Sequence, residues 1–154
     1  MTYEYVYAIA REEDGSAILD FDKFPEIVCE ITKADIQQEK VKTIAFDAVK
    51  NALQARIDYN DDIPASDMAS SSENGQVVTL SPLHILKISL YRALREAKCT
   101  RAEFAKRASV TPTGLVRAFD LYHASRFDVL IDMFTKLGYS VSANIDVQKT
   151  ATGR

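Results

Sequence analysis

Alternating apolar and polar positions open the chain and predict a small sheet. Residues 3–9 place three tyrosines on one face of a strand, because strand side chains point alternately to the two faces. The acidic run that ends in Gly15 predicts a tight turn, since glycine accepts a positive φ at little cost. Residues 16–21 then read as the returning strand and residues 27–31 as a third one.

A helical period replaces this alternation after residue 35. Apolar residues recur every three or four positions and predict one long helix over about 36–58. Asp35 is expected to cap this helix, with Gln38 completing a capping box. Residues 65–76 lack apolar periodicity and predict a flexible loop, and residues 77–80 predict a short strand. The order β-β-β-α-β indicates a sheet with one covering helix.

From residue 81 the pattern changes to short helices with hydroxyl residues at their starts, as helix caps require. These helices are predicted over about 82–97, 100–108, 111–120 and 125–137. Gly138 suits the left-handed position that ends the last of them, and the alternation over 139–147 predicts a final strand. The predicted fold class is therefore α+β, with one domain over 1–80 and a helical second domain over 81–147.

Composition narrows the class of protein. The chain is 47% hydrophobic and 27% charged, which is typical of a soluble globular protein. Without a signal peptide or an apolar run of the roughly 20 residues that a membrane span needs, we expect a cytoplasmic protein that does not bind membranes. Cys29 and Cys99 have no neighbouring ligand residues, so buried free thiols are expected and neither a metal nor a cofactor.

The two halves of the chain carry opposite charge. Residues 1–75 hold 7 Lys/Arg and 16 Asp/Glu, whereas residues 76–154 hold 12 Lys/Arg and 6 Asp/Glu. The first half is suited to a cationic partner and the second to an anionic one. Solubility alone explains such a distribution equally well, so charge by itself decides nothing.

The segment from Thr100 to Asp120 has the spacing of a helix-turn-helix. Glu103, Ala105 and Val110 fall where such a unit places a polar bracket, a small residue at the helix crossing and an apolar plug. The second helix of the pair would lie in the major groove of DNA. The alternative is a structural helical bundle whose basic face is merely solvated.

The candidate DNA contacts divide by the part of the duplex they would meet. Arg101 and Lys106 are candidates for phosphates, and Arg117 is a candidate for a bidentate pair with guanine. Ser125 and Arg126 open a further helix that can add a phosphate contact. The full predicted set is Thr100, Arg101, Lys106, Thr111, Thr113, Gly114, Arg117, Ser125 and Arg126.

Three acidic residues raise the question of an enzyme. Asp20, Asp22 and Glu26 lie close in sequence, and metal-dependent nucleases need several converging carboxylates. No acid of the first strand faces them, so either a solvated edge or a patch that meets a protein partner is the favoured interpretation. His84 and His123 are isolated and are interpreted as loop or capping residues.

Two motifs give the chain a resemblance to HicB-type antitoxins of the branch with a C-terminal helix-turn-helix. Residues 100–108 are similar to the family's Thr-x-x-Glu-Leu-Ala helix, and residues 115–128 to its Arg-Leu-Phe-x-Leu-x-His-x-(Ser/Thr)-(Lys/Arg)-x-Asp stretch. The likeness spans roughly residues 3–145. The chain departs from the family at Ser109, where the turn often has glycine, and at Gly114, which removes a side chain from the recognition helix.

The resemblance implies an antitoxin without catalytic activity. Its N-terminal domain would have a partial ribonuclease-H-like fold that covers a HicA-type mRNA interferase, a small basic ribonuclease. Its phage-repressor-like C-terminal domain would bind operator DNA of its own operon as a dimer or higher oligomer. Two alternatives stay open: a stand-alone repressor whose N-terminal domain dimerises or senses a ligand, and a nuclease that uses the N-terminal carboxylates.

Overall fold

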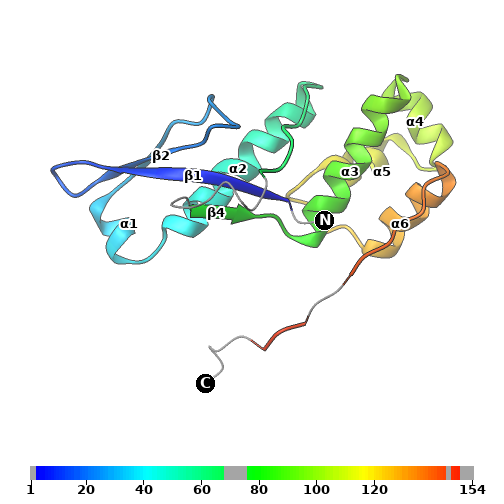
Figure 1. Cartoon of the computed structure of the whole chain (residues 1–154). Helices are drawn as coiled ribbons and strands as arrows, with labels where there is room; N and C mark the ends of the chain where they lie inside the picture. Colours follow the sequence, from blue (N-terminus) through cyan, green and yellow to red (C-terminus); the bar gives the residue numbers. More distant parts are fainter. Residues whose placement is uncertain (1–2, 68–75, 145–146, 150–154) are drawn as a thin grey trace.

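The computed structural model describes residues 3–67, 76–144 and 147–149 and has the predicted α+β class (Figure 1). Its single sheet holds four strands in the order β3-β2-β1-β4, and all neighbours are antiparallel. The strands are β1 (Glu4–Arg11), β2 (Ala17–Asp20), β3 (Cys29–Ile31) and β4 (Gln76–Thr79). The sheet and its long helix lie at one end of the molecule, and the four C-terminal helices lie at the other (Figure 1). The closer likeness to a ribonuclease-H fold stays a prediction.

The predicted turn forms between β1 and β2. Gly15 has a φ of +88°, and its N–H donates to the carbonyl of Glu12 at 3.1 Å. The hairpin register pairs Ala10 with Ile18 and Ala8 with Asp20. This register places the exposed Asp20 on the sheet face opposite the buried Leu19.

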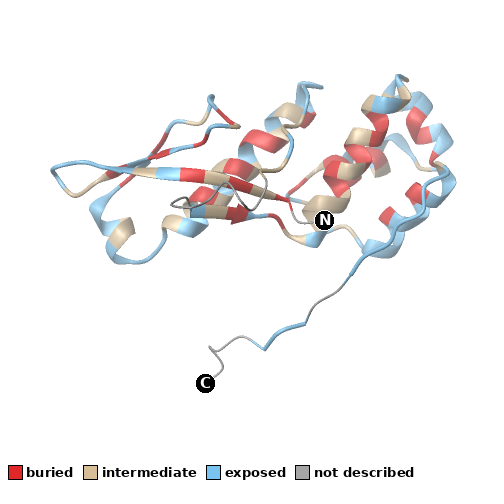
Figure 2. Cartoon of the chain, in the orientation of Figure 1, coloured by how far each residue is buried: buried red, intermediate tan, exposed pale blue. Residues whose placement is uncertain are grey.

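The three tyrosines of β1 lie in the core, as the alternation predicts. Tyr5 and Tyr7 are fully or almost fully buried (Figure 2). They face α2 (Val41–Asp58), whose apolar stripe includes Val49, Leu53 and Ile57 at 0% exposure. Burial of such side chains contributes about 1.5–3 kcal/mol each, so this contact between sheet and helix holds the N-terminal half together.

The predicted helix entry at Asp35 is wrong. Thr32 caps a separate short helix, α1 (Lys33–Gln37), and Asp35 is the partner within its capping box. The Thr32 hydroxyl holds the pKa of the Asp35 carboxyl below its usual range. Glu39 then adopts a left-handed φ of +55°, which ends one helical segment before α2 begins at Val41.

The four predicted C-terminal helices form: α3 (Pro82–Ala97), α4 (Arg101–Arg107), α5 (Pro112–Phe119) and α6 (Phe127–Lys136). Helix α3 packs against each of the other three. Between α4 and α5, Ser109 is left-handed with a φ of +55°, and the Val110 N–H donates to the Ala105 carbonyl at 3.0 Å. Gly138 is also left-handed, at +86°, just beyond α6.

The predicted final strand over 139–147 is wrong within the described residues. Residues 139–144 and 147 are exposed and belong to no strand, and residues 145–146 lie outside the described part. A strand needs a neighbour for its backbone hydrogen bonds, and here the segment leads away from the helices without meeting the sheet (Figure 1). The alternation of apolar and polar residues over this segment was therefore not enough to predict a strand.

The predicted flexible loop over 65–76 is described only at its ends. Ser66 and Asp67 hydrogen-bond to β1: the Asp67 carboxylate accepts from the Val6 N–H at 2.8 Å, and the Ser66 hydroxyl accepts from the Glu4 N–H at 2.8 Å. Gln76 already belongs to β4. Residues 68–75 lie outside the described part, and the division into domains at residue 80 stays a prediction.

Candidate DNA-binding site

Helix α5 presents an exposed face at its N-terminal end. The Thr111 hydroxyl caps it by accepting the Gly114 N–H at 3.0 Å, and Pro112 occupies the first turn, where a missing N–H costs nothing. Leu115, Ala118 and Phe119 are buried below this helix, and Thr113, Val116 and Arg117 are exposed. A short amphipathic helix of this kind keeps its outer side chains available to a ligand.

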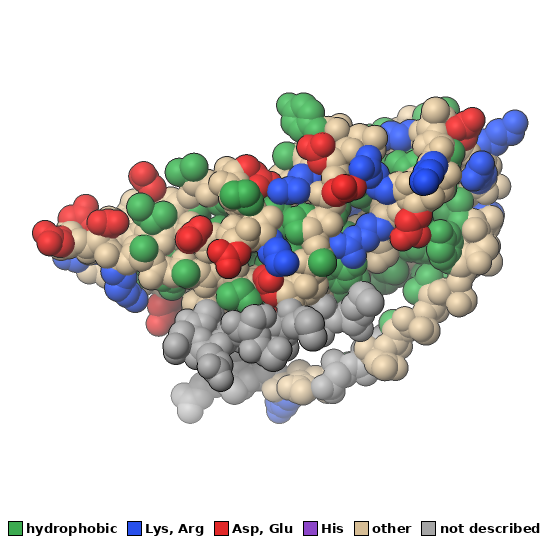
Figure 3. Space-filling view, turned by 45° about the horizontal axis from the view of Figure 1, so that its top comes forward, with side chains coloured by type: hydrophobic (Ala, Val, Ile, Leu, Met, Phe, Trp, Pro, Cys, Tyr) green, Lys and Arg blue, Asp and Glu red, His purple; other side chains and the backbone are tan. Residues whose placement is uncertain are grey.

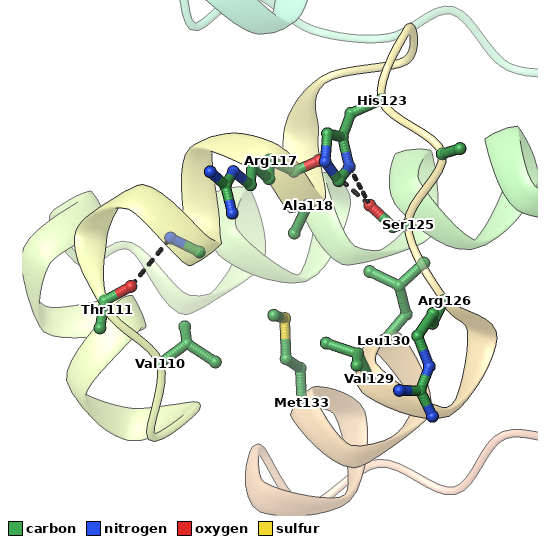
Figure 4. Close-up of a pocket in the computed structure, with 12 residues that line it drawn as sticks. Val110, Thr111, Arg117, Ala118, His123, Ser125, Arg126, Val129, Leu130 and Met133 are labelled. Atoms are coloured by element: carbon green, nitrogen blue, oxygen red, sulfur yellow. Dashed lines mark hydrogen bonds between the residues drawn. The ribbon is translucent and has the colours of Figure 1, made fainter.

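An open hollow of about 430 Å³ lies between α5 and α6 (Figure 4). Its apolar wall includes Val110, Leu130 and Met133, and Arg117 lies at its upper side. Five of the nine predicted DNA contacts line this one hollow: Thr111, Gly114, Arg117, Ser125 and Arg126. The structure therefore gathers residues from two helix starts that the sequence separates by more than ten positions.

Basic side chains are prominent over the helical half. On the face in Figure 3, Lys and Arg gather over the helices, whereas Asp and Glu prevail towards the tip of the sheet. Lys106 and Arg117 are exposed. Arg126 is exposed as well and pairs with Asp128 at 2.5 Å between Nη2 and Oδ2. An exposed pair of this kind contributes little, about 0–1 kcal/mol, so a phosphate can replace the aspartate.

Two predicted contacts are engaged within the chain. Arg101 donates from Nη2 to the Ile57 carbonyl at 2.6 Å and lies over the ring of Phe119. Thr100 caps α4, where its hydroxyl and N–H bond to the Glu103 carboxylate. These bonds hold the pKa of Glu103 below its usual range. Arg101 is thus half-buried against α2 and is not placed beside the hollow.

The loop that follows α5 is held by side chains that sequence reasoning missed. We call residues 120–125 the exit loop. Lys87 of α3, fully buried, donates from Nζ to the carbonyls of Asp120 and His123 at 2.5 and 2.7 Å. Burial lowers the pKa of Lys87 to about 8. The one signal for this role in the sequence was a lysine on the apolar face of α3. Lysine is almost never fully buried unless it is paired, so its position there indicates bound acceptors.

The two histidines have the local roles that the sequence suggested. His84 bonds through Nδ1 to the Ser81 hydroxyl at 2.9 Å and through Nε2 to the Leu121 carbonyl at 3.0 Å. Because that carbonyl only accepts, Nε2 carries the proton and Nδ1 accepts from Ser81. Burial lowers the pKa of His84. His123 bonds through Nδ1 to Ser125 within the exit loop.

The three predicted acidic contacts do not form one cluster. Asp20 and Asp22 are exposed at and after the end of β2. Glu26 instead pairs with Arg56 of α2 at 2.8 Å, and this bond holds the pKa of Glu26 below its usual range. In the part of the chain that the structure describes, no three His, Cys, Asp or Glu side chains are grouped as metal ligands.

The structure also bears on two other expectations from the sequence, which concern the two cysteines and membrane-spanning helices. Cys29 is buried and Cys99 is half-buried, so full burial holds for the first thiol alone. Burial raises the pKa of Cys29. Among the described residues, no helix combines the length and apolar character needed to cross a bilayer.

Comparison with known proteins points to the toxin–antitoxin class. The chain is 27% identical over 143 residues to "Antitoxin HicB 1" of Photorhabdus laumondii subsp. laumondii, covering 92% of this chain and 86% of that protein. It is 28% identical over 144 residues to "Antitoxin HicB" of Pseudomonas fluorescens, covering 94% of each. No protein-family profile matches. The resemblance to HicB-type antitoxins is therefore confirmed, and it supports an antitoxin role.

Proposed function

We propose that this chain neutralises a HicA-type mRNA interferase toxin by direct binding and represses its own operon by binding operator DNA. The observation that carries the DNA-binding part is the hollow between α5 and α6, which five predicted contacts line. Helix α5 would enter the major groove, and α4 would cross the backbone. Arg117 would read a base, while Lys106 and Arg126 would meet phosphates.

The N-terminal half would bind the toxin. It has a net acidic charge, and Asp20 lies on the sheet face away from α2 beside the small residues Ala8 and Ala10. Exposed acidic side chains such as Asp20 would attract a small basic ribonuclease and steer it into place. Asp20 and Asp22 are our candidate contacts. Glu26 is a weaker candidate because its carboxylate already pairs with the Arg56 guanidinium.

Self-association would complete the DNA-binding unit. Phe127 and Ile131 lie one turn apart on α6 and are 47% and 40% exposed, and the exposed Tyr139 and Val141 follow them. A second copy would cover these side chains and present two α5 helices to a two-fold operator, as helix-turn-helix dimers do.

One experiment tests both activities. Purified protein is titrated into labelled DNA from upstream of its gene and into a shuffled duplex, and separately into RNA mixed with a HicA-type mRNA interferase. We expect preferential binding to the upstream duplex and protection of the RNA from the interferase. Equal binding to both duplexes would refute the repressor part, and unprotected RNA would refute the toxin part.

A further inference from the structure

Lys87 stands out among the residues that the structure describes, because it is the one charged side chain that is completely buried. Its Nζ donates to three carbonyl oxygens, those of Arg117, Asp120 and His123, at 3.1, 2.5 and 2.7 Å. An ammonium group has three protons, so the three acceptors use its full donor capacity. All three carbonyls belong to the end of α5 or to the exit loop.

These carbonyls also accept bonds within their own segment: those of Arg117, Asp120 and His123 accept backbone N–H groups at 3.3, 3.1 and 2.9 Å. The last carbonyls of a helix have no donor within the helix, and a cation near them is favourable. The Arg117 carbonyl otherwise accepts long bonds, from the Asp120 N–H and the Ser125 hydroxyl, each at 3.3 Å. Those local bonds do not reach α3, so the Lys87 ammonium supplies the principal polar tie between α3 and the end of α5, beside the ring contact of Tyr91 with Phe119.

Two more side chains hold the same loop at Leu121. The Gln54 amide oxygen, on α2, accepts the Leu121 N–H at 2.7 Å, and the His84 ring donates to the Leu121 carbonyl at 3.0 Å. The exit loop is thus tied both to the helix that covers the sheet and to α3. These bonds hold the C-terminal end of α5, where Arg117 lies, relative to α2 and α3.

We propose that Lys87 is a positioning residue for DNA recognition, which fixes the orientation of α5 through the carbonyls at its end. This inference rests on the proposed DNA-binding role. Lys87 is inside the protein and cannot touch DNA, so any effect of its replacement on the choice of base must pass through α5 or the exit loop that follows it. Gln54 serves the same purpose from the side of α2.

The test compares the full-length protein with Lys87→Met, which keeps the aliphatic stem and removes the donors. Affinities for the upstream duplex and the shuffled duplex are measured by fluorescence anisotropy, and circular dichroism confirms folding. We expect the ratio of specific to non-specific affinity to fall roughly 5- to 100-fold, the loss that one disordered base contact implies. Binding to the shuffled duplex should stay unchanged, because phosphate contacts do not depend on exact register. Lys42→Met, an exposed lysine on α2, is the matched control.

A second variant covers the case in which Lys87→Met does not fold. Gln54→Ala removes the bond to Leu121 without emptying a buried charged site, and we expect a smaller fall in the same ratio. Folded Lys87→Met with the parent's ratio would overturn the inference, as would an unchanged ratio in Gln54→Ala if Lys87→Met is unfolded. If the parent itself shows no preference for the upstream duplex, the proposed function fails rather than the role of Lys87.

Discussion

The guanidinium of Arg101, at the start of α4, donates a hydrogen bond to the carbonyl oxygen of Ile57 in the last turn of α2. The two residues are 44 positions apart in the chain. The bond joins the helical half to the helix that covers the sheet. An arginine whose sequence position suggested a phosphate contact thus acts within the protein.

Arg101 and Lys106 should therefore respond differently to replacement. Lys106→Ala should weaken all DNA binding and lower the slope of log affinity against log salt by about 1, because a phosphate contact is lost. Arg101→Ala should leave that slope unchanged and lower the free energy of unfolding by about 1.5–3 kcal/mol, the contribution of a hydrogen bond from a charged group. Titrations at several salt concentrations and urea unfolding separate the two effects. A reduced slope in Arg101→Ala would show that the arginine leaves Ile57 to meet DNA.

Arg117→Ala should relax the choice of base at one operator position. The expected loss of specific binding is about 1–3 kcal/mol, as for other bidentate arginine–guanine pairs. Lys136→Ala is the control, since Lys136 lies at the end of α6 and pairs with Asp132. Affinities for a panel of duplexes with single base changes would measure the effect. If Arg117→Ala discriminates among them as the parent does, α5 is not the reading helix.

Reversal of charge at Asp20 and Asp22 should slow binding of the toxin. The double replacement by lysine should reduce the association rate about tenfold at low salt, because steering depends on complementary charge. Glu96→Lys, an exposed acid on α3, is the matched control and should have little effect. Stopped-flow measurements give the rates. Equal rates for the double variant and the control would place the toxin contact elsewhere.

The pair of Glu26 and Arg56 predicts a small dependence of stability on pH. Because the pKa of Glu26 is lower in the folded state than in the unfolded one, the pair stabilises the protein above the unfolded pKa. That stability is lost as the pH falls through the folded pKa. Glu26→Gln should lower the free energy of unfolding at pH 7 by at most about 1 kcal/mol, since the pair is partly exposed. The difference should vanish once the pH lies well below the folded pKa of Glu26, and urea unfolding at a series of pH values checks it.

Ser109→Gly should stabilise the protein by about 1 kcal/mol. Ser109 has a φ of +55°, a conformation that costs a residue with a side chain about 1–2 kcal/mol and costs glycine little. Ala102→Gly, within α4, should have the opposite sign and a similar size because glycine is a poor helix former. Thermal and urea unfolding measure both variants. Destabilisation by Ser109→Gly would mean that the turn relaxes once the side chain is gone.

Local patterns predicted most of the fold. Alternation located β1, short strand-like segments located β2, β3 and β4, and capping residues located α3 to α6. The error at the start of the long helix has a local cause, whereas the strand predicted over 139–147 fails because it meets no neighbouring strand in the described part. Asp35 was predicted as the helix cap, whereas Thr32 is the cap and Asp35 is its partner in the capping box. Glu39 takes a left-handed conformation, which the sequence does not predict because the residue is not glycine.

The sequence could predict which residues form the candidate site, but it could predict only part of their arrangement in space. Thr111 and Arg117 belong to one short helix, so their neighbourhood follows from sequence. The approach of Ser125 and Arg126 to the same hollow depends on how α6 packs on α3. The ties from Lys87 and Gln54 to the exit loop join residues more than 30 positions apart, and no spacing rule connects them.

The sequence by itself determined the periodic elements, the opposite charges of the two halves and the likeness to HicB-type antitoxins, because these depend on residues that are neighbours along the chain. Only the tertiary structure decided that Arg101 faces Ile57, that Lys87 is buried beneath α5 and that the residues after Gly138 pair with no strand in the described part. Those outcomes depend on which surfaces meet when helices and sheet pack, and a buried charge is tolerated only where that packing brings enough acceptors to it.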